Sequence, residues 1–288
     1  MASTGLQSRL KAFFSHSIDS ISSVSGGDIS EAYLVKLSNS QKYFVKFNSS
    51  DFASNMFQKE KNGIITIASS DTISVPNVVG VESFEQGAFL VLEHIETTSS
   101  STKTLTHFGQ ELAAMHNYQN NAFGLDSDNY IGSLEQFNTR SKDWISFYAK
   151  ERLQKQFDLA LFKGLLSKDE IPELKDSIEI LSSLIPTEQA SLLHGDLWNG
   201  NFLTGTNGST YLIDPAVYYG DRIVDIAMSQ LFGGFGKDFY ESYFHWSPKI
   251  HNFQERIDLY QLYYLLVHLN LFGCSYYSSV KQILQCYF

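Results

Sequence analysis

The chain has 288 residues, of which 43% are hydrophobic and 14% aromatic, which is enough for a packed core and too much for disorder. Its 31 Asp and Glu residues outnumber its 21 Lys and Arg residues and give a formal net charge of −10. Nonspecific binding to nucleic acid or to an anionic membrane depends on summed positive charge, so this composition argues against both partners. We therefore expect a globular protein that acts on a small molecule.

The first residues lack the apolar core of about 7–15 residues that a signal peptide needs, so we expect a cytoplasmic protein. Two cysteines, Cys274 and Cys286, are too few for a secreted disulfide framework. If the segment between them is helical they lie about 18 Å apart, and we expect no bridge. The sequence leaves open whether the protein is a monomer or a homodimer.

Short runs of β-branched and aromatic residues dominate the chain from Ile21 to Leu92. Gly, Asn and Ser separate these runs, as is typical of antiparallel hairpins. One helix is predicted among them, over residues 51–69, with Asp51 as its N-cap and apolar residues at helical spacing. Glu60 lies on the apolar face of this helix, and a buried carboxylate needs a cationic partner.

The Ser- and Thr-rich run at residues 96–102 is the most loop-like part of the chain, and we place a boundary there. Residues 1–95 form a predicted nucleotide-binding lobe, and residues 96–288 form a mainly helical lobe with the catalytic loop and the substrate site. Amphipathic stripes around 105–115, 144–153, 171–184 and 257–272 predict helices. Two short apolar strands, 191–194 and 210–213, interrupt them, so the predicted fold class is α+β with two lobes.

The most informative stretch is His-Gly-Asp-Leu-Trp-Asn-Gly-Asn at 194–201, followed by Ile-Asp-Pro at 213–215. Phosphoryl transfer requires a group that orients a hydroxyl nucleophile and ligands that hold metal ions against the nucleotide phosphates. Asp196 would accept the hydroxyl proton. Asn201 and Asp214 offer the hard oxygen ligands that Mg²⁺ prefers.

The same chemistry requires a lysine on a strand and a glutamate on the neighbouring helix. Lys46 projects from a predicted strand on the same face as Phe44, and Glu60 is the misfit on the predicted helix. We predict that Lys46 holds the α- and β-phosphates of ATP and that Glu60 fixes its position.

Two further segments are predicted to contact the nucleotide. Gly26 and Gly27 lie between the first two strands, where backbone amides could cover phosphates; a plain hairpin turn is the alternative. Glu93, His94 and Ile95 end the last strand before the boundary, where a hinge would offer backbone groups to adenine.

Three polar residues near the loop are interpreted as braces. His194 lies at the loop entrance. We expect it to support the loop by hydrogen bonds and not to contact the substrate. Asp221 or Asp225 could be a third metal ligand, but we favour helix capping and acceptance of backbone N–H bonds from the catalytic loop.

The pattern resembles the protein-kinase-like superfamily and, within it, the fructosamine kinase (ketosamine-3-kinase) family. The resemblance covers nearly the whole chain, through stretches at 26–33, 44–47, 123–125, 129–132, 136–138, 143–156, 194–201, 213–216 and 268–273. Trp198 stands where protein kinases usually place Lys, which argues against a protein hydroxyl as acceptor. Asn199 departs from the family pattern, which has Ser at this position.

The resemblance implies a bilobal protein-kinase-like fold and ATP-dependent phosphorylation of the 3-hydroxyl of a ketosamine, leading to deglycation. The substrate would be a fructosamine, ribulosamine or erythrulosamine adduct, either a small molecule or a glycated protein lysine. ATP and Mg²⁺ are the implied cofactors. The implied substrate contacts are Gln136, Asn138, Trp144 and Trp198.

Two other functions stay open from the sequence: a small-molecule kinase of the aminoglycoside or choline type, and a catalytically silent nucleotide-binding protein. The family-like substrate residues favour the ketosamine kinase over the first. The complete set of base, lysine, glutamate and metal ligands argues against the second.

Overall fold

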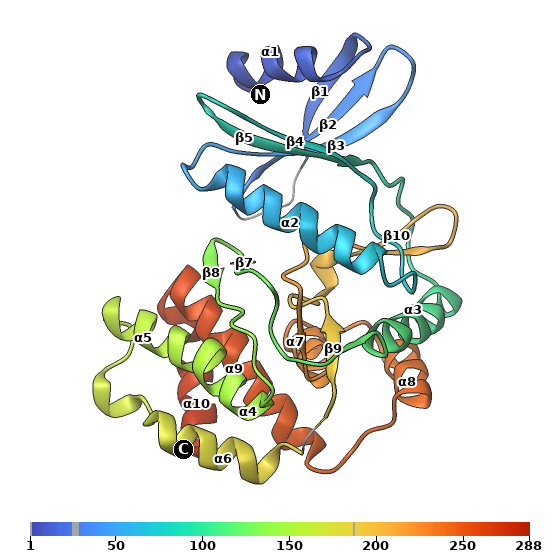
Figure 1. Ribbon diagram of the computed structural model, residues 1–288. Helices are drawn as coiled ribbons and strands as arrows, with labels where there is room; N and C mark the ends of the chain where they lie inside the picture. The colour runs from blue at the N-terminus through green and yellow to red at the C-terminus, as the bar shows by residue number, and fades with distance from the viewer. Residues whose placement is uncertain (1, 25–28, 187) are drawn as a thin grey trace.

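A five-stranded antiparallel sheet forms one end of the protein in the computed structural model, which describes residues 2–24, 29–186 and 188–288 (Figure 1). The strands follow the order β1-β2-β3-β5-β4 and confirm the predicted hairpins. Their bounds are β1 (Ile18–Val24), β2 (Glu31–Leu37), β3 (Lys42–Asn48), β4 (Val78–Phe84) and β5 (Gly87–Glu93).

Two helices cover the two faces of this sheet. In β5, Phe89 and Val91 pack with α1 (Thr4–Phe13), whereas Leu90 and Leu92 pack with α2 (Ala53–Ala68), as the alternation of side chains along a strand requires. The apolar stripe predicted for α2 is confirmed. The predicted N-cap is wrong, because the helix begins after Phe52, which makes no side-chain capping bond.

The connection from β5 to α3 (Thr102–His116) leads out of the sheet, and Ser101 starts α3 with a capping box. On the way the chain bonds to the hairpin of β10 (Phe202–Thr204) and β11 (Thr210–Leu212): the Thr98 amide donates to the Thr204 carbonyl at 2.9 Å. We call the elements α1 to β5 the sheet half and those from α3 onward the helical half. The predicted boundary between residues 95 and 96 falls in this connection and stays a prediction.

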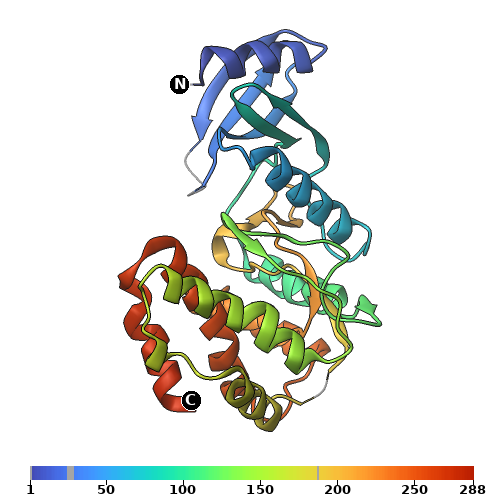
Figure 2. The same ribbon diagram turned by 60° about the vertical axis from the view of Figure 1, so that its left-hand side comes forward.

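Helices make up most of the helical half, as predicted (Figure 2). They are α3, α4 (Trp144–Phe147), a π-helix (Tyr148–Gln154), α5 (Lys155–Phe162), α6 (Leu174–Leu184), α7 (Ile223–Leu231), α8 (Lys237–Trp246), α9 (Phe253–Phe272) and α10 (Tyr277–Tyr287). Helix α9 is apolar on most of its surface and contacts α5, α7 and α10, so it is the centre of this half. The predicted α+β fold class is confirmed.

Short strands complete the helical half. β9 (Ala190–Leu193) pairs with β12 (Tyr218–Gly220) and β6 (Gln119–Asn120), and β7 (Asn129–Ile131) pairs with β8 (Leu134–Gln136). Cys274 and Cys286 are exposed and are not bridged to each other in the structure. In the described part of the chain, no helix is both long enough and apolar enough to cross a membrane.

Candidate active site

A cavity of about 770 Å³ lies between the two halves, and both contribute to its walls. Nine of the residues predicted from the sequence line it: Lys46, Glu60, Glu93, His94, Ile95, Asp196, Trp198, Asn201 and Asp214. Gly26 and Gly27 lie outside the described residues. Residues separated by more than 160 positions thus meet at one site.

Lys46 is the centre of a partly buried ion cluster in this cavity. Its Nζ donates to both carboxylate oxygens of Glu60, at 2.9 and 3.0 Å, and lies 2.9 Å from Oδ1 of Asp214. Burial alone would lower the pKa of Lys46, but the charges of Asp214 and Glu60 outweigh it and raise the pKa above the ordinary value. The lysine is therefore a fixed cation. The sequence predicted the pairing of Lys46 with Glu60, but not that Asp214 also contacts the lysine.

The catalytic loop takes its shape from Gly195. This residue has φ of +83°, and a Cβ at this position would lie 2.1 Å from the carbonyl oxygen of Ala216. Only glycine fits both constraints. The loop can therefore lie directly against the segment that follows Asp214.

His194 braces the loop, as predicted. Its Nε2 lies 2.9 Å from the Ile213 carbonyl oxygen, and its Nδ1 accepts from the Asp196 amide at 3.2 Å. Burial lowers the pKa of His194, which favours the neutral ring that these two roles require. The residue thereby ties the loop to the strand end that carries Asp214.

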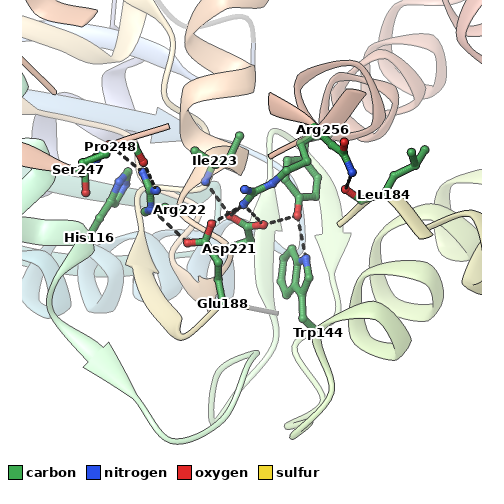
Figure 3. A network of polar contacts seen from close by, with 12 residues as sticks. His116, Trp144, Leu184, Glu188, Asp221, Arg222, Ile223, Ser247, Pro248 and Arg256 are labelled. Atoms are coloured by element: carbon green, nitrogen blue, oxygen red, sulfur yellow. Dashed lines mark hydrogen bonds and ion pairs between the residues drawn. The ribbon is translucent and has the colours of Figure 1, made fainter. Parts of the chain in front are cut away.

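Asp225 accepts the His194 amide at 2.7 Å and the Gly195 amide at 2.9 Å, so it is the predicted brace. Asp221 accepts the Ile223 amide at 2.9 Å at the start of α7, and Figure 3 shows it surrounded by buried polar partners. Both carboxylates lie outside the lining of the cavity. The structure favours the bracing interpretation over a third metal ligand.

Asp196 and Asn201 are bonded to each other across the loop. The amide nitrogen of Asn201 donates to the main-chain oxygen of Asp196 at 2.9 Å and to its Oδ2 at 3.0 Å. Desolvation raises the pKa of Asp196 to about 7, although the bond from Asn201 acts in the opposite direction. A carboxylate with a pKa near neutrality is suited to accept a proton.

The donor set fits a hard divalent cation. The amide nitrogen of Asn201 is turned toward Asp196, so its oxygen is the atom that can serve a metal ion, and Asp214 supplies a carboxylate in the same cavity. Asp214 also has φ of +54°, a conformation that non-glycine residues adopt rarely and that concentrates at functional sites.

Of the four predicted substrate contacts, only Trp198 lines the cavity. Gln136, Asn138 and Trp144 are 2%, 1% and 4% exposed and belong to the interior. The indole of Trp144 donates to the Tyr260 hydroxyl at 2.9 Å, beside Asp221 (Figure 3). The structure does not bring these three residues to the cavity, so the prediction that they contact substrate directly finds no support here.

Residues of the β7–β8 hairpin also line the cavity, among them Asn129, Tyr130 and Gly132. The segment 129–132 belonged to the family-like pattern, but the sequence assigned it no role. His268 and Phe272 from α9 also line the cavity. Their spacing of four residues indicated a shared helix face but not its position at the cavity.

Comparisons with known proteins agree on one family. The family model described as fructosamine kinase matches residues 3–288. A protein named "Probable ketoamine kinase" from Vibrio parahaemolyticus is 39% identical over 262 residues, covering 90% of this chain and 88% of its own. A chloroplastic protein-ribulosamine 3-kinase of Oryza sativa subsp. japonica is 38% identical over 275 residues, covering 94% and 79%.

Solved structures show the same likeness. A candidate fructosamine-3-kinase from Haemophilus somnus 129PT superposes with a TM-score of 0.88 at 29% identity, covering 98% of this chain and 96% of that chain. A thermostable mutant of the aminoglycoside phosphotransferase APH(4)-Ia, in a ternary complex with AMP-PNP and hygromycin B, superposes at 0.66 with 16% identity and 98% coverage of both chains. The latter likeness concerns the fold alone.

Proposed function

The chain belongs to the fructosamine kinase family, and on this premise we propose that its cavity transfers a phosphoryl group from ATP to the 3-hydroxyl of a ketosamine. The family resemblance and the protein-kinase-like fold expected from the sequence are confirmed. The protein is an ATP-dependent phosphotransferase with an alcohol group as acceptor, and its products lead to deglycation. The acceptor is a ketosamine on a small molecule or on a protein lysine.

Asp196 is the proposed proton acceptor. As the acceptor oxygen forms its bond to the γ-phosphorus, the hydroxyl proton passes to the Asp196 carboxylate and the bond from that phosphorus to the ADP oxygen breaks. The bond from Asn201 to Oδ2 holds the carboxylate in one orientation, and its bond to the main-chain oxygen of Asp196 ties the two residues together across the loop. Asp225 accepts the backbone amides of His194 and Gly195, which directly precede Asp196, and so holds this part of the loop in place.

Lys46 is the proposed phosphate ligand. Glu60 and Asp214 fix its ammonium group, so little side-chain entropy is lost when it meets the phosphates. Glu93, His94 and Ile95 line the same cavity from the end of β5, and we assign their backbone to the adenine. Gly26 and Gly27 stay predicted phosphate-covering residues.

Asn201 and Asp214 would hold a divalent cation, and we propose Mg²⁺. When bound, such a cation neutralises phosphate charge and leaves most of its coordination shell to phosphate oxygens and water. Asn201 is bonded to Asp196, and Asp214 lines the same cavity.

The observation that supports this function most is the convergence of Lys46 and Glu60 with Asp196, Asn201 and Asp214 in one cavity. The test is a panel of acceptors, with ADP release measured for ribulose-lysine, fructose-lysine, choline and an aminoglycoside in the presence of Mg-ATP. We expect turnover of the ketosamines. Turnover of choline or the aminoglycoside alone would assign the protein to another small-molecule kinase activity.

The Asp196→Asn variant separates catalysis from binding. It keeps the size and the hydrogen-bond reach of the side chain but cannot accept the proton. We expect turnover to fall by a factor on the order of 10² or more while ATP binding stays nearly unchanged. Unchanged turnover would remove Asp196 from the role of base.

A further inference from the structure

The β7–β8 hairpin (Asn129–Gln136) joins the helical half to α2 across the cavity. On the basis of the proposed function, we infer that this hairpin is a positioning element: through Tyr130 it holds the first turn of α2, and with it Glu60 and Lys46, in a fixed relation to Asp214. Figure 1 shows the hairpin directly beneath α2. The inference depends on contacts at both ends of the hairpin.

The base of the hairpin is bonded to the segment that follows Asp214. The side-chain amide of Gln136 donates to the Ala216 carbonyl at 3.0 Å and to Oδ1 of Asn129 at 2.8 Å. The amide of Asn129 in turn donates to the Val217 carbonyl at 2.8 Å. The base therefore moves with the backbone that carries the proposed metal ligand.

A second layer of polar contacts makes this base rigid. Asn138 donates to Oδ1 of Asn129 at 2.8 Å and accepts from Nη2 of Arg152 at 2.7 Å. Arg152 is fully buried, and its guanidinium lies 4.0 Å from the centre of the Tyr218 ring. A buried cation is costly unless it is well bonded, so this anchor is expected to keep one arrangement. Asn138 and Gln136 thus support the hairpin from below.

The tip of the hairpin contacts the first turn of α2. The amide of Asn55 donates to the Tyr130 hydroxyl at 3.0 Å, and the Tyr130 ring stacks on Phe52 with 6.1 Å between ring centres. Gly132, at the turn, has φ of +59° and leaves space where a Cβ would lie 3.1 Å from Ile29 and 3.0 Å from Leu271. The hairpin is therefore fitted between the two halves.

Helix α2 is also held farther along its length. A Cβ on Gly63 would lie 3.2 Å from Pro215 and 3.3 Å from Val217, so the helix packs closely on the segment after Asp214. Glu60 lies between this contact and the Tyr130 contact. Because a helix moves as a rigid rod over one or two turns, loss of the Tyr130 contact shifts or rotates Glu60, and Lys46 follows its partner.

The test uses Asn55→Ala and Tyr130→Phe, singly and together, with direct ATP affinity and steady-state kinetics as readouts. Asn55 is exposed and lies outside the cavity lining, so its removal affects the nucleotide only through α2. We expect each change to weaken ATP binding and raise the KM for ATP by about fivefold, the range of one hydrogen bond, with a smaller effect on kcat. Because both changes remove the same hydrogen bond, the double variant should bind ATP no more weakly than either single variant.

Matched variants complete the design. Gln58→Ala removes an exposed α2 side chain that donates to Asn62 in the same helix, and it should leave ATP affinity unchanged. Tyr130→Ala also removes the stack on Phe52. It should bind ATP more weakly than Tyr130→Phe, which keeps the ring. Thermal unfolding of each variant shows whether lost affinity is merely lost stability.

Three results would overturn the inference. If Tyr130→Phe weakens ATP binding and Asn55→Ala does not, the hydroxyl contacts the ligand directly. If the losses of ATP affinity in Asn55→Ala and Tyr130→Phe add fully in the double variant, the two residues act independently. If neither changes affinity, the hairpin does not position α2. ATP affinity is measured without an acceptor, so a wild-type protein that binds ATP but phosphorylates no ketosamine would refute the proposed function and still decide the role of the hairpin.

Discussion

At the scale of single residues, Lys46 depends on two carboxylates that come from different halves of the molecule, Glu60 on α2 and Asp214 after β11. The Lys46→Met variant leaves these two carboxylates close together without the cation between them. Two such carboxylates repel each other and repel phosphate. We expect kcat/KM for ATP to fall at least about 10²-fold, measured by ADP release at varied ATP.

Lys42 provides the control for this prediction. It lies on the same strand as Lys46 and pairs with Glu96 at the surface, where ion pairs contribute little. Lys42→Met should therefore keep wild-type kinetics. An equal loss of kcat/KM for ATP in the two variants would show that the net charge of the sheet explains the result. The ion cluster of Lys46, Glu60 and Asp214 would then have no specific role.

Asp225 is the second residue whose role can be isolated. Its carboxylate accepts two backbone amides of the catalytic loop and lies 3.2 Å from Nε2 of His116. Asp225→Asn places an NH₂ group where an acceptor is needed and leaves a buried amide unpaired. We expect the free energy of unfolding to fall by about 1–3 kcal/mol, measured by urea denaturation, and kcat to fall at least about tenfold.

Asp176→Asn, on the exposed surface of α6, should change neither quantity. If Asp225→Asn lowers stability but keeps the wild-type kcat, the residue supports the fold and not the geometry of the loop.

At the scale of elements, α9 holds the catalytic loop and the start of α7 together. The Tyr264 hydroxyl donates to the Gly195 carbonyl at 2.8 Å. Arg256 forms a buried pair with Asp221, with Nη2 2.7 and 2.6 Å from its two oxygens (Figure 3). Glu188 approaches the same guanidinium at 2.7 Å from the segment that leads into β9. These contacts connect three segments that are distant in the sequence.

Removal of the Arg256 cation leaves Asp221 buried without its charge partner. We expect Arg256→Met to lower the free energy of unfolding by about 3–5 kcal/mol, measured by chemical denaturation. The double variant Arg256→Met with Asp221→Asn should be less destabilised than the single variant, since the uncompensated charge is gone. Arg140→Met breaks an ion pair with the exposed Asp126 and serves as the control. A double variant that is worse than the single one would contradict this account.

The elements differ in how well their sequence predicted them. Strands of the sheet half were predictable because short runs of β-branched and aromatic residues between turn residues are a local signal. The packing of β5, whose neighbouring side chains contact opposite helices, became visible only in the fold. The π-helix at Tyr148–Gln154 was not, because its hydrogen-bond pattern differs from an α-helix by one residue and leaves little trace in composition. The start of α2 was also missed, since a plausible capping residue at Asp51 makes no cap.

At the scale of the whole molecule, the proposed site lies between the two halves, so a ligand bound there would stabilise both. Binding to the native state alone raises its stability by about 2.7 kcal/mol when the ligand is at 100 times its Kd. We expect Mg-ATP to raise the melting temperature in a thermal shift assay. Without a divalent cation, less positive charge opposes the phosphates and the carboxylates of Asp196 and Asp214, so EDTA should reduce the shift.

A matched pair of proteins checks this prediction. The Lys46→Met variant should show a smaller shift with Mg-ATP than the wild type, because its cavity has lost its fixed cation. An equal shift with Mg-ATP and with ATP plus EDTA would contradict the assignment of Asn201 and Asp214 as metal ligands.

The net charge of −10 makes this local arrangement necessary. An acidic protein that binds a polyanion has to concentrate positive potential at one place, since the summed field of the molecule is unfavourable. Lys46, held between Glu60 and Asp214, supplies a fixed cation there. The proposed metal ion would supply the rest.

The strands and main helices could be predicted from local composition and periodicity, and the pairing of Lys46 with Glu60 from the need of a carboxylate on an apolar helix face for a cation. The order of the groups in the catalytic loop can be read directly from residues 194–201. The fold was needed to show that Asp214 joins Lys46, that Gln136 and Asn138 support a hairpin, and that Trp144 is interior. These facts depend on distances between segments that are far apart in the chain, and such distances follow from the packing of whole elements and not from the pattern of any one of them.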